Sequence, residues 1–352
     1  MSAYFNLKVK ELIKETEEAV TIVFEHPAKG KLSYKPGQFL TLILTIDNEK
    51  LRRSYSLCTA PSADDFPAIT VKKVINGKAS NYLFNTIKQG DVIEAMQPAG
   101  TFTVETKRFG SRNAVLIGAG SGITPLLGIA KAILEDESSS TVYLLYGNRN
   151  EQSIIFEKKL EALTTKYKGR LKTIHVLSQP DASWKGQTGR LNRPSIIKLL
   201  ETFPSFKFAK ADYFICGPEG MMHEALDALK ILGVPGDKIH KESFASSAPQ
   251  ESGHIVTSNS IADTEVMVIY QGTEYKFKVP ASQSILQAAL DQDIDLPYSC
   301  QSGLCTACMG KCVSGKVKLD ETDALSDKEL EKGYVLTCVG HPVTNDVVIE
   351  ID

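Results

Sequence analysis

Four cysteines near the C-terminus stand at a spacing that could hold a metal centre. Cys300, Cys305 and Cys308 follow the pattern C-x4-C-x2-C, and 29 residues separate Cys308 from Cys338. One loop can then wrap three thiolates around a cluster while a distant segment supplies the fourth, which is a ligand arrangement of 2Fe–2S centres. Gly303 lets the backbone of that loop approach the inorganic sulfides closely.

Other uses of these cysteines fit the sequence less well. The chain has seven cysteines and no signal-peptide pattern at its start, which disfavours disulfides. Structural zinc sites prefer paired C-x2-C knuckles, and only one such pair is present. Lys311 stands where the two-cluster pattern C-x2-C-x2-C needs a cysteine. Cys312 is then a thiol that does not ligate, although it is the alternative to Cys308, and Cys58 has no assigned role.

A second group of candidate residues lies in the first hundred positions. The run Arg53-Ser54-Tyr55-Ser56 offers a guanidinium for a pyrophosphate, an aromatic plane for a ring and a hydroxyl for a polar ring edge. The turn that begins at Gly77 leads into a predicted helix start, which can cradle an anion. These features predict a flavin site that comprises Arg53, Ser54, Tyr55, Ser56, Gly77, Ala79 and Ser80, and Lys72 is a further candidate for cofactor binding.

Two glycine turns, each between a strand and a helix, follow in the middle of the chain. A short apolar strand runs into Gly118, Gly120 and Gly122, and an apolar helix is predicted over 126–134. Strand, glycine turn and helix together form a phosphate-binding arrangement. We expect Thr124 to cap this helix and Pro125 to occupy its first turn. The second turn is Cys216-Gly217-Pro218, before a helix predicted over 219–232.

The loop after the next strand bears on the choice of nucleotide. Tyr146-Gly147-Asn148-Arg149-Asn150 has no acidic residue for a ribose hydroxyl, whereas Arg149 could meet a 2′-phosphate. The sequence therefore favours NADPH over NADH. The alternative is that Arg149 is a solvated loop residue.

The pattern of elements changes twice along the chain. Closely spaced strand segments with turn signals up to about residue 105 predict a small antiparallel barrel. Strands then alternate with helices to about residue 245, including a helix over 151–167, which predicts a parallel α/β sheet. A small polar stretch over 246–262 reads as a linker. A hairpin around Gln271-Gly272, a helix over 282–291 and short strands follow.

These motifs resemble those of a known family. Residues 1–245 resemble the ferredoxin–NADP reductase superfamily, and the remainder resembles plant-type ferredoxins of β-grasp fold. The resemblance implies a barrel over 1–107 that binds FAD, with FMN as the alternative. It also implies a nucleotide domain over 108–245, a linker over 246–262 and an iron–sulfur domain over 263–352. It places Ser56, the small polarizable Cys216 and the aromatic Phe244 beside the path of hydride transfer. A buried structural thiol is the alternative for Cys216, and an ordinary core position is the alternative for Phe244.

The order of the three domains resembles reductase components of multicomponent oxygenases. It implies electron flow from NAD(P)H through a flavin and a 2Fe–2S cluster to a protein acceptor, with an oxygenase component as the expected partner. A hybrid-cluster protein, a desaturase or a steroid hydroxylase could accept the electrons instead. A redox sensor without turnover is the alternative of a different class.

Charge and hydropathy limit the other partners. The net charge of −2 argues against nucleic acid. Residues 263–352 carry 7 basic and 15 acidic side chains (net −8), whereas the rest carries 33 and 27 (net +6), which suggests electrostatic docking within the chain or with a partner. No run of 18 apolar residues is present, so we expect no membrane span and a cytoplasmic protein.

Overall fold

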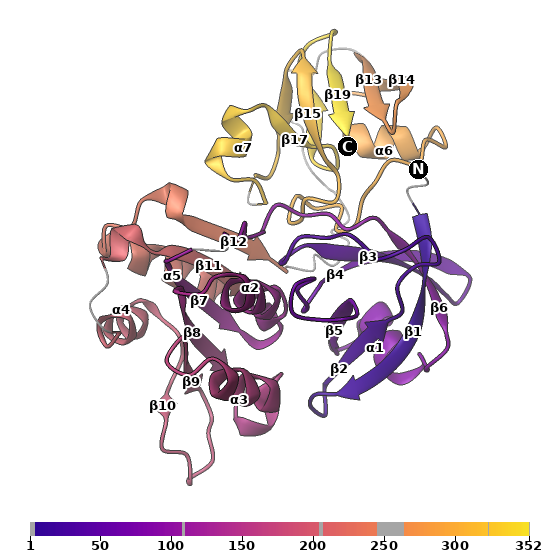
Figure 1. Cartoon of the computed structure of the whole chain (residues 1–352). Coiled ribbons are helices and arrows are strands. Elements are labelled where there is room, and N and C mark those ends of the chain that lie inside the picture. Colours follow the sequence, from indigo (N-terminus) through magenta and orange to yellow (C-terminus); the bar gives the residue numbers. More distant parts are fainter. Residues whose placement is uncertain (1–3, 108–109, 204–206, 245–263, 323, 352) are drawn as a thin grey trace. The chain divides into compact units, whose positions relative to one another are not determined.

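The computed structural model describes residues 4–107, 110–203, 207–244, 264–322 and 324–351 (Figure 1). The chain divides into two compact units, one over Tyr4–Phe244 and one in the C-terminal part. The predicted linker over 246–262 lies outside the described residues. No helix in the described ranges is long and apolar enough to cross a membrane.

Six antiparallel strands form the N-terminal sheet, in the order β4-β3-β6-β1-β2-β5. A bridge between Leu57, just beyond β4, and Ile69 of β5 joins the two edges, so the sheet curls into the predicted barrel. Alternating side chains fill its interior, and helix α1 (Lys78–Asn85) follows β5. The strands are β1 (Tyr4–Lys14), β2 (Ala19–Phe24), β3 (Phe39–Ile46), β4 (Glu49–Ser56), β5 (Ala68–Lys72) and β6 (Val92–Met96).

The second sheet is parallel, as predicted, with the order β10-β9-β8-β7-β11-β12. The chain builds outward from β7 to β10 and then returns to the other side of β7, so the strand order switches between β7 and β11. Its strands are β7 (Asn113–Ala119), β8 (Thr141–Asn148), β9 (Leu171–Leu177), β10 (Gln187–Thr188), β11 (Asp212–Gly217) and β12 (Ile239–Ser243). Its helices are α2 (Ile123–Asp136), α3 (Glu157–Lys166), α4 (Arg193–Glu201) and α5 (Glu219–Ile231).

Two helix predictions in this region need correction. Helix α2 begins at Ile123, with Gly122 at the N-cap, so Thr124 lies inside the first turn and does not cap the helix. The predicted helix over 151–167 begins only at Glu157. Phe156 before it adopts a left-handed conformation (φ 66°), and a short 3₁₀ turn capped by Asn150 precedes it. Residues Ile154 to Phe156 leave the helical path and are buried, which accounts for the break.

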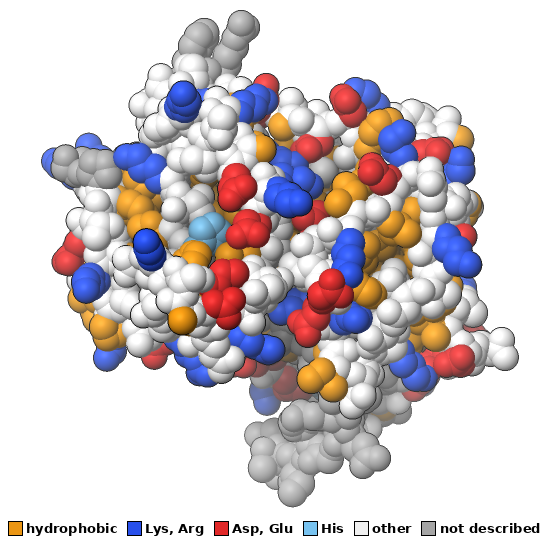
Figure 2. Space-filling view, turned by 90° about the horizontal axis from the view of Figure 1, so that it is seen from below, with side chains coloured by type: hydrophobic (Ala, Val, Ile, Leu, Met, Phe, Trp, Pro, Cys, Tyr) orange, Lys and Arg blue, Asp and Glu red, His pale blue; other side chains and the backbone are white. Residues whose placement is uncertain are grey.

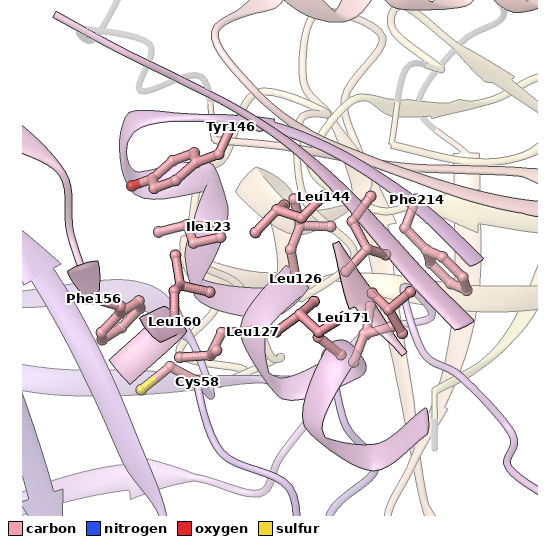
Figure 3. Close-up of a cluster of buried hydrophobic side chains, with 14 of the residues drawn as sticks. Cys58, Ile123, Leu126, Leu127, Leu144, Tyr146, Phe156, Leu160, Leu171 and Phe214 are labelled. Carbon is pink, nitrogen blue, oxygen red and sulfur yellow. The ribbon is translucent and has the colours of Figure 1, made fainter. Parts of the chain in front are cut away.

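The barrel and the parallel sheet share one hydrophobic core. Every residue of α2 from Ile123 to Leu134 is buried. The cluster around it includes Phe102 and Cys58 from the barrel segment, and Figure 3 shows Cys58 beside Leu127 of α2. A side chain at Gly128 would lie 3.0 Å from the carbonyl oxygens of Leu57 and Thr59, so this helix approaches the barrel backbone at a glycine. The shared core fixes the end of β4 relative to the parallel sheet.

The C-terminal unit has a mixed sheet, in the order β14-β13-β19-β15-β17, and a two-stranded sheet of β16 and β18. The hairpin turns at Gln271-Gly272, as predicted, and Ser284 caps the first helix, which is shorter than expected. The strands are β13 (Thr264–Tyr270), β14 (Thr273–Val279), β15 (Met309–Ser314), β16 (Val317–Leu319), β17 (Tyr334–Leu336), β18 (Gly340–Pro342) and β19 (Val348–Ile351). The helices are α6 (Ile285–Leu290) and α7 (Asp327–Glu331).

Candidate functional site

The glycine turns of the parallel sheet meet at the point where its strand order switches. β7 ends at the turn Gly120–Gly122, and β11 ends at Cys216-Gly217 beside it. A side chain at Gly122 would lie 2.1 Å from the carbonyl oxygen of Cys216, so only glycine allows the two turns to approach this closely. Ligands of open parallel sheets bind beyond the carboxyl ends of the strands at such a switch.

Contacts around the first turn hold its backbone in place. Gly120 has a φ of 55°, and its carbonyl accepts a hydrogen bond from the Tyr146 hydroxyl at 2.9 Å. Thr124 Oγ1 donates to the carbonyl of Ser121 at 3.0 Å, and Pro125 lies in the first turn of α2, as predicted. The Lys72 ammonium from the barrel lies 3.9 Å from where a Cβ of Gly120 would be. A cation from the first domain therefore stands beside the phosphate-binding turn of the second.

The end of β4 is joined to the parallel sheet by a hydrogen bond. The buried Ser56 donates from Oγ to Oε2 of Glu242 at 3.0 Å, across 186 positions of sequence. Glu242 lies on β12, where it pairs in register with Cys216 of β11. Ser56, Cys216 and Glu242 thus meet where the barrel faces the carboxyl ends of the strands.

Burial sets the charge state of this three-residue cluster. Loss of solvation raises the pKa of Glu242 to about 8, although the hydrogen bond from Ser56 opposes the rise. Burial also raises the pKa of the Cys216 thiol well above its usual value, and the Glu242 charge adds to this effect. Both groups are therefore protonated at neutral pH.

Sequence reasoning missed Glu242. It stands in the segment His240 to Phe244 that closes the domain, but no motif marks the glutamate. Its role depends on the pairing of β12 with β11 and on the approach of β4. The signal that could have found it is an acidic residue in the strand predicted to pair beside the Cys-Gly-Pro turn.

The other predicted flavin residues of β4 lie on both faces of the strand. Arg53 is exposed, and its guanidinium donates only to the carbonyl of Arg52, at 2.7 Å, among the described contacts. Tyr55 packs on the barrel core, and burial raises its pKa. Ser54 bonds with Thr41 through their hydroxyls at 2.9 Å. Arg53 therefore has guanidinium donors available for an anion, whereas the Ser54 hydroxyl links β4 to β3 within the barrel.

The predicted anion cradle at α1 depends on the backbone and not on the serine hydroxyl. Gly77 is the N-cap residue and no side chain caps the helix. Ser80 Oγ accepts a hydrogen bond from Val74 N at 3.1 Å and donates to the carbonyl of Gly77, so it holds the preceding loop together. The buried Ala79 packs on the barrel core. The backbone N–H groups of the first turn are the groups that can face an anion.

The remaining predicted nucleotide residues lie around the carboxyl edge of the parallel sheet. Gly118 packs against Leu126 of α2, and Pro218 is the N-cap residue of α5. Arg149 follows β8 and is exposed, and in the described ranges no hydrogen bond or ion pair engages its guanidinium. Phe244 is the last described residue of this unit and is 38% exposed.

The four predicted cluster cysteines converge in the C-terminal unit. Hydrogen bonds from the Cys305 and Cys338 thiols hold the pKa of Cys300 far below its usual range. The Cys338 thiol likewise lowers the pKa of Cys308. Thr337 donates from its backbone and its hydroxyl to the carbonyl of Cys308, both at 3.2 Å, which ties the distant segment to the loop. Four thiols in mutual contact fit the two irons of the cluster, each of which takes two of them.

The other thiols are engaged elsewhere. Cys312 Sγ donates to the carbonyl of Ser314 at 3.1 Å, and burial raises its pKa. Cys58 is buried in the shared core and accepts a hydrogen bond from Thr70. Within the described ranges, no three His, Cys, Asp or Glu side chains surround a position for a single metal ion.

Three domain families match the chain in succession. An oxidoreductase FAD-binding domain matches residues 5–104, an oxidoreductase NAD-binding domain matches 116–227, and a 2Fe-2S iron-sulfur cluster binding domain matches 268–343.

Two relatives are similar over nearly their whole length. A 1,2-phenylacetyl-CoA epoxidase subunit from Escherichia coli is 36% identical over 100% of this chain and 99% of its own. The ferredoxin reductase component of 3-ketosteroid-9-alpha-monooxygenase from Rhodococcus rhodochrous is 35% identical over 98% of this chain and 96% of its own.

Solved structures share the fold. Phthalate dioxygenase reductase is 23% identical with a TM-score of 0.59, covering 99% of this chain and 98% of that one. An intact self-sufficient cytochrome P450 monooxygenase of type IV is 18% identical with a TM-score of 0.70, covering 99% of this chain but 41% of that longer one.

Proposed function

Because the chain belongs to the family of oxygenase reductase components that join FAD-binding, NAD-binding and 2Fe–2S domains, we propose that it supplies electrons to a phenylacetyl-CoA epoxidase. The chain is an NAD(P)H-dependent flavin and iron–sulfur oxidoreductase, and its electron acceptor is a protein. The identity of 36% over both full lengths supports the epoxidase as the specific partner.

The meeting of Ser56, Cys216 and Glu242 is the observation that carries the proposed site of hydride transfer. When bound, the flavin supplies the conversion between a two-electron hydride donor and a one-electron cluster. Glu242 and Cys216 keep their protons at neutral pH, so neither adds a negative charge where hydride arrives. The Ser56 bond, 3.0 Å long, holds the Glu242 carboxyl against the end of β4. Phe244 is the candidate aromatic cover of the flavin ring.

The phosphate groups would be bound by separate parts of the chain. Arg53 and the backbone N–H groups at the start of α1 are the proposed contacts for the FAD pyrophosphate. The turn Gly120–Gly122, with Lys72 beside it, is the proposed contact for the nicotinamide nucleotide. Arg149 is the proposed contact for a 2′-phosphate, which would make NADPH the preferred donor.

In the C-terminal unit we assign Cys300, Cys305, Cys308 and Cys338 as the ligands of the 2Fe–2S cluster. Their mutual contacts and the tie between Thr337 and Cys308 support this set. Cys312 does not belong to it, because its thiol bonds with Ser314.

A second candidate partner is a steroid monooxygenase, because its reductase component is 35% identical over nearly both full lengths. Purified oxygenase components of both kinds should be tested with the holoprotein and NADPH. Product formation with the epoxidase component but not with the steroid component supports the proposal. Product formation with the steroid component only would make the steroid monooxygenase the partner instead.

An anaerobic absorption spectrum tests the electron path itself. Both flavin and iron–sulfur bands should bleach on addition of NADPH, and more slowly on addition of NADH. Flavin bands without iron absorbance would reject the cluster assignment. Failure to reduce cytochrome c with either nucleotide would favour a sensor without turnover.

A further inference from the structure

A buried hydroxyl in the cysteine loop, residues 300–308, has no nitrogen or oxygen partner in the described part of the chain. Ser302 Oγ is shielded from solvent and makes no well-formed hydrogen bond there, although the side chain lies against the Cys300 thiol. A serine hydroxyl carries a donor and two acceptor sites, and such groups are satisfied in most folded proteins. The acceptor nearest to this hydroxyl is therefore a sulfur of the proposed ligand set.

The loop holds Ser302 in a defined position. Gln301 and Gly303, on either side of it, both have positive φ, 57° and 74°. The loop is also covered, because a side chain at Gly303 would lie 2.7 Å from Cβ of Glu321 and 3.2 Å from Val339. Ser302 thus lies in a tight turn next to a covered glycine, and its hydroxyl is shielded from water.

The same residue already faces sulfur. The backbone N–H of Ser302 donates to Sγ of Cys300 at 3.4 Å. The Cys300 thiol lies in contact with those of Cys305 and Cys338. The acceptors that a loaded centre brings to this turn are anionic sulfurs, and hydrogen bonds to such sulfurs tune the potential of iron–sulfur clusters.

We infer that the Ser302 hydroxyl donates a hydrogen bond to a sulfur of the bound cluster and thereby stabilises its reduced form. The inference rests on the proposed ligand set of four cysteines. Reduction adds one negative charge to the cluster, so a donor aimed at its sulfur gains more in the reduced state than in the oxidised state. Ser302 is then a positioning and tuning residue that draws the electron from the flavin toward the cluster.

The test compares full-length holoprotein with Ser302→Ala in a redox titration followed by electron paramagnetic resonance of the reduced cluster. We expect the ratio of reduced to oxidised cluster at a fixed potential to fall about tenfold, which for one electron equals about 59 mV. Ser302→Thr keeps the hydroxyl and should restore most of the ratio. Ser314→Ala removes an exposed hydroxyl of the same unit, bonded to Asp346 at 3.3 Å, and should change nothing.

Iron content separates the two ways in which this reasoning could fail. Two irons per chain in Ser302→Ala with an unchanged potential would overturn the role of Ser302 alone. Two irons retained in Cys305→Ser would overturn the ligand set.

Should Ser302→Ala fail to hold the cluster, the wild-type protein provides the test. Pulsed electron paramagnetic resonance spectra of the reduced cluster must show a proton coupled to the cluster spin. Its signal must disappear within minutes of transfer to D₂O, as expected for a hydroxyl. The absence of such a proton would also overturn the inference.

Discussion

Replacement of Glu242 by glutamine should make the stability of the reductase unit less sensitive to pH. The folded protein keeps the Glu242 proton up to about pH 8, whereas the unfolded chain releases it near pH 4.5. Between these values the folded state binds more protons than the unfolded state, so the free energy of unfolding falls as pH rises. Glutamine does not titrate, and its amide oxygen can still accept the hydrogen bond from Ser56.

The magnitude follows from the width of that pH interval. Across the interval between pH 4.5 and about pH 8, each pH unit lowers the free energy of unfolding by about 1.4 kcal/mol, so the full interval corresponds to about 5 kcal/mol. The span from pH 5.5 to pH 8.5 covers about two thirds of this interval, so we expect a change of roughly 3 kcal/mol in the free energy of unfolding. The difference in the free energy of unfolding between Glu242→Gln and the wild type should therefore shift in favour of the variant by this amount from pH 5.5 to pH 8.5.

Urea unfolding at several pH values provides the assay. Trp184 is the only tryptophan of the chain and packs against the shared core, so its fluorescence reports on this unit. Glu201→Gln, at the exposed end of α4, is the matched control and should follow the wild-type pH profile. If the wild type and Glu242→Gln gave parallel profiles, Glu242 would be ionised in the folded protein and the proposed proton-holding role would be refuted.

Three further substitutions test other parts of the molecule. Cys305→Ser should abolish the iron–sulfur absorbance and leave flavin reduction by NADPH intact, whereas Cys312→Ser should preserve both; loss of flavin reduction in Cys305→Ser would contradict the modular arrangement. Arg149→Ala should raise the KM for NADPH about 10- to 100-fold through loss of a charged hydrogen bond, with little change for NADH; equal effects in steady-state kinetics would reject the 2′-phosphate contact. Arg112→Ala leaves the fully buried Glu137, now 2.5 Å from the guanidinium, without its ion pair, and should lower the free energy of unfolding by about 3–5 kcal/mol. Chemical denaturation checks this value against Lys8→Ala, which breaks an exposed pair and should cost less than about 1 kcal/mol.

Side chains of both charge signs are interspersed on the face shown in Figure 2. The sequence predicts a basic surplus for the part of the chain before residue 263 and an acidic surplus after it. An electrostatic contribution to docking, within the chain or with the protein acceptor, stays a prediction, and the salt dependence of electron transfer to the acceptor would measure it.

Regular periodic segments were predictable because their signals are local. The closely spaced strands before residue 105, the alternation of strands and helices after it and the hairpin at Gln271-Gly272 all lie where local patterns predict them. The break at Phe156 was not predictable, because the apolar run before α3 also suits a helix. Burial of that run against the shared core decided the conformation there.

The sequence by itself determined the order of the domains and the chemical groups that the chain can offer. The cysteine loop and the glycine turns are each defined by residues that are close in the sequence, so the kind of ligand that each can bind is predictable without the fold. The tertiary structure alone decided which groups meet. Ser56 donates a hydrogen bond to Glu242, which lies 186 positions later in the sequence. This contact forms because the barrel and the parallel sheet pack on one shared core and because β12 pairs with β11. Strand pairing and core packing are long-range interactions, and no local pattern encodes their partners.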